Sequence, residues 1–283
     1  MELPYAGAVS AIAMDPVEKK PLFHFYPGNQ VFSVGFYGCS FSCPFCQNYS
    51  ISQYYKTDRI MNPEDIANLA SEREAPLIAY TYNEPTVHLE YVIECSKRAG
   101  EKGIKNILVT NGHLNPEPAE EIFNYIEAAN IDLKSMNPDF YKKEIKGNLE
   151  PVKETIKIAS KKAHVEITTL VIPGKNDSVK EMEQTAEFIA SVDENIPFHL
   201  SAYYPTYKYS IPATSRSRIF DLINVAKKHL KYVYPGNVGN DASDTACLSC
   251  GNVLVERRGY SVRVKNRDRK MCDSCGAVLP YII

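Results

Sequence analysis

The chain has 283 residues, 44% of them hydrophobic, which is enough to bury a full core and excludes a disordered or fibrous protein. A formal net charge of −2 and a pI near 6.3 exclude a globally basic surface for nucleic acid or for an anionic membrane. No apolar run approaches the roughly 20 residues that span a bilayer, and the N-terminus lacks a basic leading region, so a cytoplasmic location is expected.

From residue 31 onward, short apolar segments alternate with amphipathic ones. In chain order, strands are expected at 31–37, 76–82, 106–110, 130–133, 164–172, 198–203 and 231–234. Helices are expected at 86–102, 116–129, 151–162, 180–191 and 216–230. This order predicts an α/β fold, a partial (β/α)6 barrel similar to a TIM barrel, with a small C-terminal four-cysteine module.

Three domains are expected on this basis: an N-terminal segment 1–30 that packs on the barrel, a core barrel 31–238, and a four-cysteine module 239–283 of the zinc-ribbon or rubredoxin type. Polar segments directly follow several predicted strands, at 83–85, 111–113, 134–135, 173–175 and 205–206. In a β/α barrel the loops at the carboxyl ends of the strands converge on one face. We therefore expect the chemistry at that face.

Three cysteines, Cys39, Cys43 and Cys46, lie close together directly after the first of these strands. In a reducing compartment, closely spaced cysteines indicate metal binding and not disulfides. Three thiolates in so short a loop can hold an iron–sulfur cluster and leave one iron open for a substrate. The alternatives are a zinc ion completed by a histidine such as His24, or three cysteines buried in the core.

The spacing CxxxCxφC, with Phe45 as the aromatic φ, resembles the motif of the radical S-adenosylmethionine (SAM) superfamily. The resemblance implies an oxidoreductase whose [4Fe-4S] cluster binds SAM and cleaves it reductively. A 5′-deoxyadenosyl radical would then abstract hydrogen from an unidentified small molecule or protein residue. A low-potential electron donor of the flavodoxin or ferredoxin type is implied as partner.

The same resemblance implies SAM contacts at the strand ends. Glu84 stands where the family has a Gly-Gly-Glu-like motif and would receive the methionine ammonium, although both glycines are replaced here; it would equally suit the start of a helix. Lys134, unless it is a surface lysine, would pair with the methionine carboxylate, and His199 or Tyr204 would meet the ribose. The expected contacts are Phe45, Gln47, Asn83, Glu84, Asn111, Asp132, Lys134, Ile172, His199 and Tyr204.

Two narrower resemblances bear on the substrate. The segments 110–112 (TNG) and 132–134 (DLK) resemble activating enzymes for pyruvate formate-lyase, which implies the alternative of a glycyl-radical-enzyme activase; Val109 replaces the aspartate that helps those enzymes hold a monovalent cation. The segment 14–28, the Cys-Gln-Asn end of the cluster motif and the tail resemble the radical SAM member of the AmmeMemoRadiSam system. That resemblance implies Amme-type and Memo-type partners.

A second cluster, Cys247, Cys250, Cys272 and Cys275, forms two CxxCG turns, which predict a closed four-thiolate site. Zinc is the first choice, with rubredoxin-type iron or an auxiliary iron–sulfur cluster as alternatives. The insert between the turns is a basic hairpin, expected to be a solvated edge or else a docking patch for an acidic protein or nucleic acid. Its basic residues are Arg257, Arg258, Arg263, Lys265, Arg267, Arg269 and Lys270.

A function of a different class is the remaining alternative. The chain could be a zinc-dependent adaptor or a nucleic-acid-binding protein that keeps the barrel only as a scaffold. The basic hairpin favours that alternative, but no aromatic stacking platform accompanies it, so nucleic acid is not the expected partner.

Overall fold

A computed structural model of the chain describes residues 6–56, 59–239, 243–266 and 270–279. By its contacts the chain forms two compact units. Unit 1 comprises Met1–Asp15, Gln30–Val165 and Pro205–Ser210, and unit 2 comprises Pro16–Asn29, Glu166–Tyr204 and Ile211–Ile283. The three domains expected from the sequence stay a prediction.

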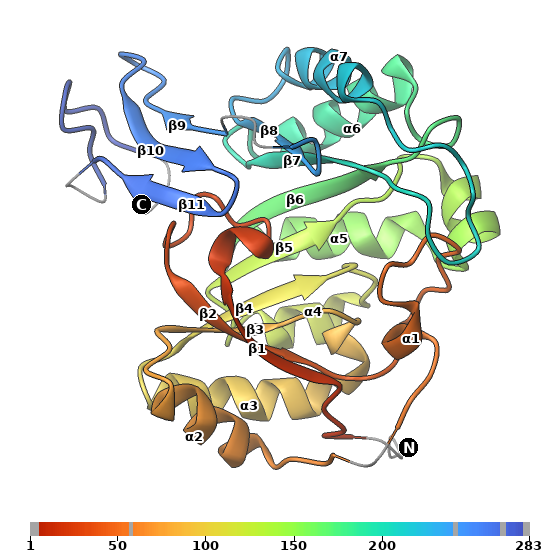
Figure 1. Cartoon of the computed structure of the whole chain (residues 1–283), viewed down its shortest axis with the longest axis vertical. Helices are drawn as coiled ribbons and strands as arrows, with labels where there is room; N and C mark the ends of the chain where they lie inside the picture. Colours follow the sequence, from red (N-terminus) through yellow and green to blue (C-terminus); the bar gives the residue numbers. More distant parts are fainter. Residues whose placement is uncertain (1–5, 57–58, 240–242, 267–269, 280–283) are drawn as a thin grey trace. The chain divides into compact units, whose positions relative to one another are not determined.

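The strands of unit 1 follow one another in chain order (Figure 1). They are β1 (Ala11–Pro16), β2 (Gln30–Gly35), β3 (Leu77–Tyr80), β4 (Lys105–Thr110) and β5 (Ala128–Asp132). The pairs β2·β3, β3·β4 and β4·β5 are parallel, so the carboxyl ends of these four strands meet at one edge of the sheet. Strand β1 was not predicted.

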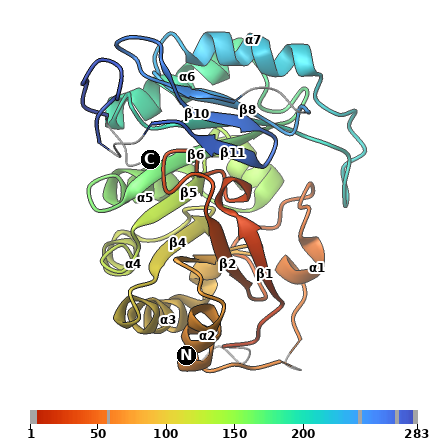
Figure 2. The same ribbon diagram turned by 60° about the vertical axis from the view of Figure 1, so that its left-hand side comes forward.

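Unit 1 also contains most of the helices. They are α1 (Tyr49–Ser52), α2 (Pro63–Glu72), the 3₁₀ turn η2 (Pro85–His88), α3 (Leu89–Glu101), α4 (Pro116–Ile122), the π-helix η3 (Phe140–Ile145) and α5 (Leu149–Ala159). Helices α3, α4 and α5 lie side by side on one face of the strands (Figure 2). Helices α1 and α2 and the π-helix were not predicted from the sequence.

The helix expected at 116–129 was wrong beyond Ile122. Ala128 and Ala129 have a high helix propensity, but both are buried and pair with Ile107 and Leu108 of β4. The burial and strand pairing of these two alanines therefore override their helix propensity, and β5 begins two residues earlier than expected.

Unit 2 contains the strands β6 (His164–Val171, from Glu166 onward), β7 (Phe198–Ala202) and β8 (Val233–Gly236), which pair in parallel. Its helices are η1 (Val17–Lys19), α6 (Val179–Val192) and α7 (Arg216–Ala226). The tail adds an antiparallel sheet of β9 (Thr245–Ala246), β10 (Val253–Arg258) and β11 (Ser261–Val264). The hairpin expected between the two CxxCG turns is confirmed.

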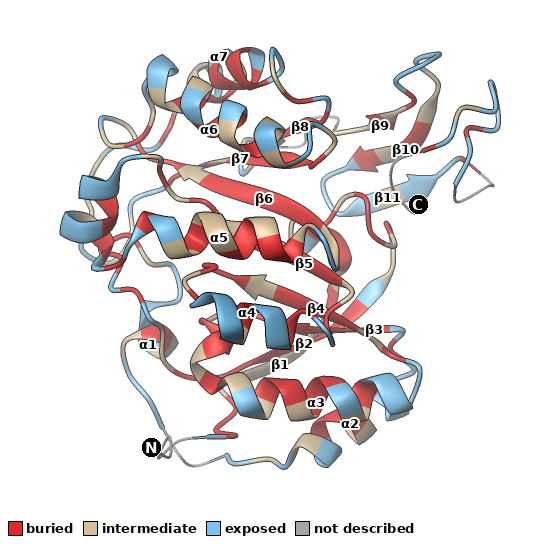
Figure 3. Ribbon diagram, turned by 180° about the vertical axis from the view of Figure 1, so that it is seen from behind, coloured by how far each residue is buried: buried red, intermediate tan, exposed pale blue. Residues whose placement is uncertain are grey.

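Burial follows the expected pattern of an α/β protein (Figure 3). Strand β3 is buried along its whole length, while α3 and α5 show bands of buried and exposed residues. The α/β fold with parallel strands and a four-cysteine tail is confirmed. Within the described ranges, no helix is both long enough and apolar enough to pass through a bilayer. The cytoplasmic location stays a prediction.

Candidate metal and cofactor site

The three clustered cysteines lie in the cluster loop, residues 38–48, which follows β2 in unit 1. The loop begins at Gly38, whose φ of +92° favours glycine and whose N–H donates to the carbonyl of Ile51 at 2.8 Å. The N–H of Cys46 donates to the carbonyl of Cys43 at 3.2 Å, which makes a tight turn between the second and third thiols. All three cysteines are free thiols.

Polar groups lie around the sulfur atoms. The N–H of Phe41 donates to Cys39 Sγ at 3.3 Å, and Asn111 Nδ2 donates to the same atom at 3.6 Å. Cys46 Sγ lies 3.3 Å from the hydroxyl of Ser52, a contact that the sequence did not indicate. Hydrogen bonds to cysteine sulfurs stabilise the negative charge of an iron–sulfur cluster and tune its potential.

The thiols of Cys39 and Cys43 are poor acids in this setting. Burial, followed by the Glu84 carboxylate, raises the pKa of Cys39 to about 12, and burial raises the pKa of Cys43 to about 11. A buried thiolate becomes favourable when a metal cation replaces its proton. The three thiols and their donors therefore fit a thiolate-ligated metal cluster.

Glu84 joins the ends of two strands. Its Oε1 atom accepts hydrogen bonds from the N–H and the hydroxyl of Thr86 at 3.1 and 2.7 Å and from the hydroxyl of Thr110 at 2.7 Å. Its Oε2 atom accepts from the N–H of Asn111 at 2.6 Å. Burial raises the pKa of this carboxyl, and the four donors oppose that rise. The expected role at the start of a helix is confirmed, because the side chain caps η2.

The two residues before Glu84 fasten the cluster loop. Asn83 Oδ1 accepts from the N–H of Phe36 at 3.0 Å, and its Nδ2 donates to the carbonyl of Gly38 at 2.9 Å. The carbonyl of Tyr82 accepts from Asn48 Nδ2 at 2.6 Å. The loop is thus held at both of its ends by the segment after β3.

Lys134 is a cation close to the cluster loop. Its ammonium lies 2.8 Å from Asp132 Oδ2, and its side chain is only 15% exposed, so the alternative of a surface lysine is wrong. Burial would lower the pKa of Lys134, but Asp132 and Cys43 outweigh it and the pKa lies above its ordinary value. The ammonium is therefore positioned near Cys43, where a bound anion would be attracted.

Phe45 holds the middle of the loop in place. It is buried, and its ring lies 6.1 Å from that of Phe140 in η3 and 5.7 Å from that of Tyr209. Gln47, by contrast, is exposed. A direct contact of either residue with SAM stays a prediction.

The remaining expected SAM contacts lie in unit 2. Ile172 is buried, and its N–H donates to Asn176 Oδ1 at 2.7 Å. His199 is only 3% exposed, and its Nε2 lies 2.6 Å from Glu166 Oε2. Tyr204 is 49% exposed, and its hydroxyl donates to the carbonyl of Asn237 at 2.9 Å. Of the two residues expected at the ribose, Tyr204 is the accessible one; the contact itself stays a prediction.

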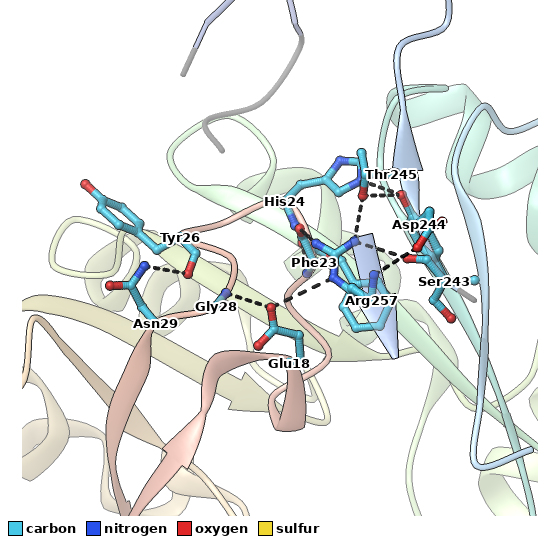
Figure 4. A network of polar contacts seen from close by, with 12 residues as sticks. Glu18, Phe23, His24, Tyr26, Gly28, Asn29, Ser243, Asp244, Thr245 and Arg257 are labelled. Carbon is cyan, nitrogen blue, oxygen red and sulfur yellow. Dashed lines mark hydrogen bonds and ion pairs between the residues drawn. The ribbon is translucent and has the colours of Figure 1, made fainter. Parts of the chain in front are cut away.

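The basic hairpin of the tail is not a uniform solvated edge, because Arg257 turns inward from β10 and is 1% exposed. Figure 4 shows its guanidinium among Ser243, Thr245, Phe23 and Glu18. It donates to the Ser243 carbonyl at 3.1 Å, to Thr245 Oγ1 at 2.8 Å and to the Phe23 carbonyl, and its Nε lies 3.8 Å from Glu18 Oε1.

The interpretation as a solvated edge was therefore wrong for Arg257, because strand alternation points it into the core of unit 2. The other described basic residues of the hairpin, Arg258, Arg263, Lys265 and Lys270, are exposed as expected. Arg267 and Arg269 lie outside the described residues.

The four tail cysteines form the expected site. Their sulfur atoms all lie within 4.8 Å of one another. Gly251 and Gly276, with φ of +74° and +71°, close the two turns by N–H bonds of 2.8 Å to the carbonyls of Cys247 and Cys272. The backbone N–H of Cys250 contributes most to lowering the pKa of Cys247 to about 7. A four-thiolate metal site is thus confirmed, and its geometry suits zinc and iron alike.

The sequence and fold of this chain are similar to those of several known proteins. The family model described as the Radical SAM superfamily matches residues 33–189. An uncharacterized protein of Methanocaldococcus jannaschii is 40% identical over 98% of this chain and 85% of its own length. A putative glycyl-radical enzyme activating enzyme of the same organism is 27% identical over 74% of this chain and 89% of its own length. The structure of Streptococcus suis SuiB bound to S-adenosylmethionine, at 14% identity, matches the fold with a TM-score of 0.57 over 78% of this chain and 53% of that chain.

Proposed function

This chain belongs to the radical SAM superfamily of enzymes, and on that premise we propose that Cys39, Cys43 and Cys46 hold a [4Fe-4S] cluster at which SAM is bound and cleaved. The bound cluster would supply the electron that breaks the C5′–S bond of SAM, so that a 5′-deoxyadenosyl radical takes hydrogen from the substrate. The observation that carries the proposal is the set of three free thiols in one short loop, with polar groups at the sulfurs of Cys39 and Cys46. Because the chain belongs to a superfamily of enzymes, the alternative of a zinc-dependent adaptor or a nucleic-acid-binding protein is no longer needed.

The residues at the strand ends would bind the methionine part of SAM. Lys134 would attract its carboxylate, since Asp132 holds that ammonium beside the cluster loop. The Glu84 carboxylate would receive the methionine ammonium in exchange for one of its present donors. Its existing bonds also give it a positioning role, because they fix the segments after β3 and β4.

The direct test is anaerobic reconstitution with iron and sulfide, reduction with dithionite, and chromatography for 5′-deoxyadenosine. Cys43→Ala should lose the iron and the product together. Cys95→Ala is the matched control, because Cys95 is a buried thiol of α3 and should keep both iron and product. Product formation by Cys43→Ala at the wild-type rate would refute the proposal.

A second candidate function is activation of a glycyl radical enzyme. It is favoured by the 27% identity to a putative activating enzyme and by the TNG and DLK segments. Incubation of the reduced enzyme and SAM with a candidate partner should then give a glycyl radical signal in EPR spectra. Absence of that signal across candidate partners, with deoxyadenosine still formed, would remove this candidate.

We also propose Amme-type and Memo-type proteins as partners, and zinc as the tail metal. The segment 14–28 and the tail, which carry the resemblance to the AmmeMemoRadiSam system, contact each other through Arg257, which bonds Phe23 and lies beside Glu18. Residues 16–28 and the tail thus both belong to unit 2 and are in contact there. Co-purification of the tagged chain with purified Amme-type and Memo-type proteins tests the partnership, and metal analysis of the purified chain tests for zinc.

A further inference from the structure

Two segments that carry lysines contact the cluster loop. The π-helix η3 borders it on one side: the N–H of Ser42 donates to the carbonyl of Ile145 at 2.9 Å, and Phe45 packs on Phe140. The segment 205–210 borders it on another, because the N–H of Lys208 donates to the carbonyl of Pro44 at 2.9 Å. Both contacts lie within unit 1.

These two bordering segments carry an excess of positive charge. Lys142, Lys143, Lys146 and Lys208, here called the basic rim, are all exposed. Residues 139–146 and 205–210 contain only two carboxylates, those of Asp139 and Glu144, against these four lysines. Asp139 is paired with Lys143 at 2.8 Å, and Glu144 accepts a hydrogen bond from the Tyr209 hydroxyl. The local charge is thus +2 (four minus two), on a chain whose net charge is −2.

A pair of stacked tyrosines adjoins the rim. Tyr49, which follows Cys46 by three residues and is 38% exposed, stacks on Tyr207 with ring centroids 4.4 Å apart and planes at 9°. The ammonium of Lys208 lies 4.9 Å from the Tyr207 ring centroid. Tyr207 is half-buried. Accessible tyrosines beside charged residues are typical of protein interfaces, since a tyrosine offers a large contact area with few rotatable bonds.

The cluster loop is buried in some parts and exposed in others. Buried or largely buried polar groups contact it at the strand ends, with Asn111 at Cys39 and Lys134 near Cys43. Residues 47–50, directly after Cys46, are all exposed. An electron donor would thus approach the loop at this exposed segment.

We propose that the basic rim and the Tyr49–Tyr207 stack form the docking surface for an acidic, low-potential electron-transfer protein. This inference rests on the proposed function, because a cluster that cleaves SAM must be reduced. In the step, one electron leaves the reduced donor and one enters the cluster, and no bond or proton changes hands. Lysines around such a surface steer an acidic partner by long-range attraction, and a small contact is enough for a transient encounter.

The test compares two triple variants of equal charge change. Lys142→Glu/Lys146→Glu/Lys208→Glu reverses the rim, and Lys143 is left in place because it pairs with Asp139. The control, Lys161→Glu/Lys227→Glu/Lys228→Glu, reverses three exposed lysines outside the two bordering segments. The probe is an acidic ferredoxin, kept reduced by NADPH and a ferredoxin reductase, and dithionite serves as a small reductant that needs no docking surface.

Two measurements are made at low ionic strength: the Kd for ferredoxin without SAM, and the rate of 5′-deoxyadenosine formation at limiting ferredoxin. The rim variant should bind ferredoxin at least about tenfold more weakly and turn over correspondingly slowly, while its dithionite-driven rate matches wild type. For the control variant, both the Kd for ferredoxin and the rate of 5′-deoxyadenosine formation should stay within about twofold of the wild-type values.

Equal ferredoxin Kd values for the two triple variants would overturn the docking surface. Failure of wild type to form 5′-deoxyadenosine with dithionite would instead refute the proposed function, and the Kd comparison would still decide whether the rim binds an acidic protein. A further variant, Tyr49→Ser/Tyr207→Ser, should also weaken ferredoxin binding. An unchanged Kd for it would remove the stack from the surface.

Discussion

Replacement of Arg257 by alanine should loosen the tail of unit 2. Arg257 is buried with Glu18, the side chain of each being 1% exposed, and it bonds the Phe23 carbonyl and Thr245. Truncation would leave the Glu18 carboxylate buried without its cation, and breaking a buried pair in this way costs about 3–5 kcal/mol. The neighbouring Arg258 is 52% exposed and makes only surface pairs, so Arg258→Ala should cost about 0–1 kcal/mol.

Amide hydrogen exchange is the suitable assay, because it reports the opening of β9–β11 and of residues 16–29 separately from the rest of the chain. A loss of about 3–5 kcal/mol predicts exchange roughly 150-fold to 4000-fold faster in these segments, with β3 and β4 as the internal reference. The Arg258→Ala variant should exchange like wild type. Equal exchange in the two variants would refute the burial argument.

The pH dependence of the Arg257→Ala variant gives a second check. Burial raises the pKa of Glu18 above its ordinary value, and the Arg257 guanidinium opposes that rise. Without Arg257 the pKa should rise further, so protonation at lower pH removes the unpaired charge and the loss of stability should shrink as pH falls. Adding Glu18→Gln to the variant should likewise restore part of the stability at neutral pH. No restoration would mean that Glu18 is not the group left uncompensated.

Three further predictions concern the cluster loop, pH and the tail metal. In Gly147→Ala, the new Cβ would lie 2.2 Å from Phe41 Cε1 and would displace the cluster loop, so iron incorporation should fall. The control is Gly100→Ala, which has open space around its Cβ and should incorporate iron like wild type. His88 is buried and its Nε2 donates to the Tyr37 carbonyl, so burial lowers its pKa. The unfolded state then binds more protons below pH about 6.5. The free energy of unfolding measured by urea titration should therefore fall as the pH falls, by up to about 1.4 kcal/mol per pH unit, and His88→Gln should lack this contribution. One cysteine-to-serine change among the four tail ligands should remove the tail metal, measured by mass spectrometry, and leave cluster iron unchanged.

Much of the fold could be predicted, because its signals are local. The run that became β3, Leu77–Tyr80, is continuous and apolar, and β4 contains the apolar run 107–109; such runs are typical of strands buried on both faces. Both cysteine clusters were visible from spacing alone, since a metal site built from one or two short turns leaves its ligands close in sequence. Boundaries failed where local propensity opposed burial, as at Ala128 and Ala129.

The polar contacts of the site could not be predicted in the same way, because they join distant segments. Glu84 was expected to face a ligand, but Thr86, Thr110 and Asn111 bond its carboxylate, and only the fold brings the latter two near it. The burial of Arg257 depends on Phe23, 234 positions earlier in the chain. A composition-based interpretation assigns such an arginine to the surface, since arginine is rarely buried unless it is paired.

Tyr82, which stands in the place of a glycine of the Gly-Gly-Glu-like motif, has a backbone conformation that favours glycine. Tyr82 has a φ of +74°, which glycine adopts freely and tyrosine only with strain. The strain is opposed by two bonds: the Tyr82 hydroxyl donates to Asp15 Oδ2 at 2.5 Å, and its carbonyl accepts from Asn48 at the end of the cluster loop. The side chain is thereby held toward β1, and the backbone toward the cluster loop. The backbone two residues before Glu84 is thus held in a conformation that glycine would adopt without strain.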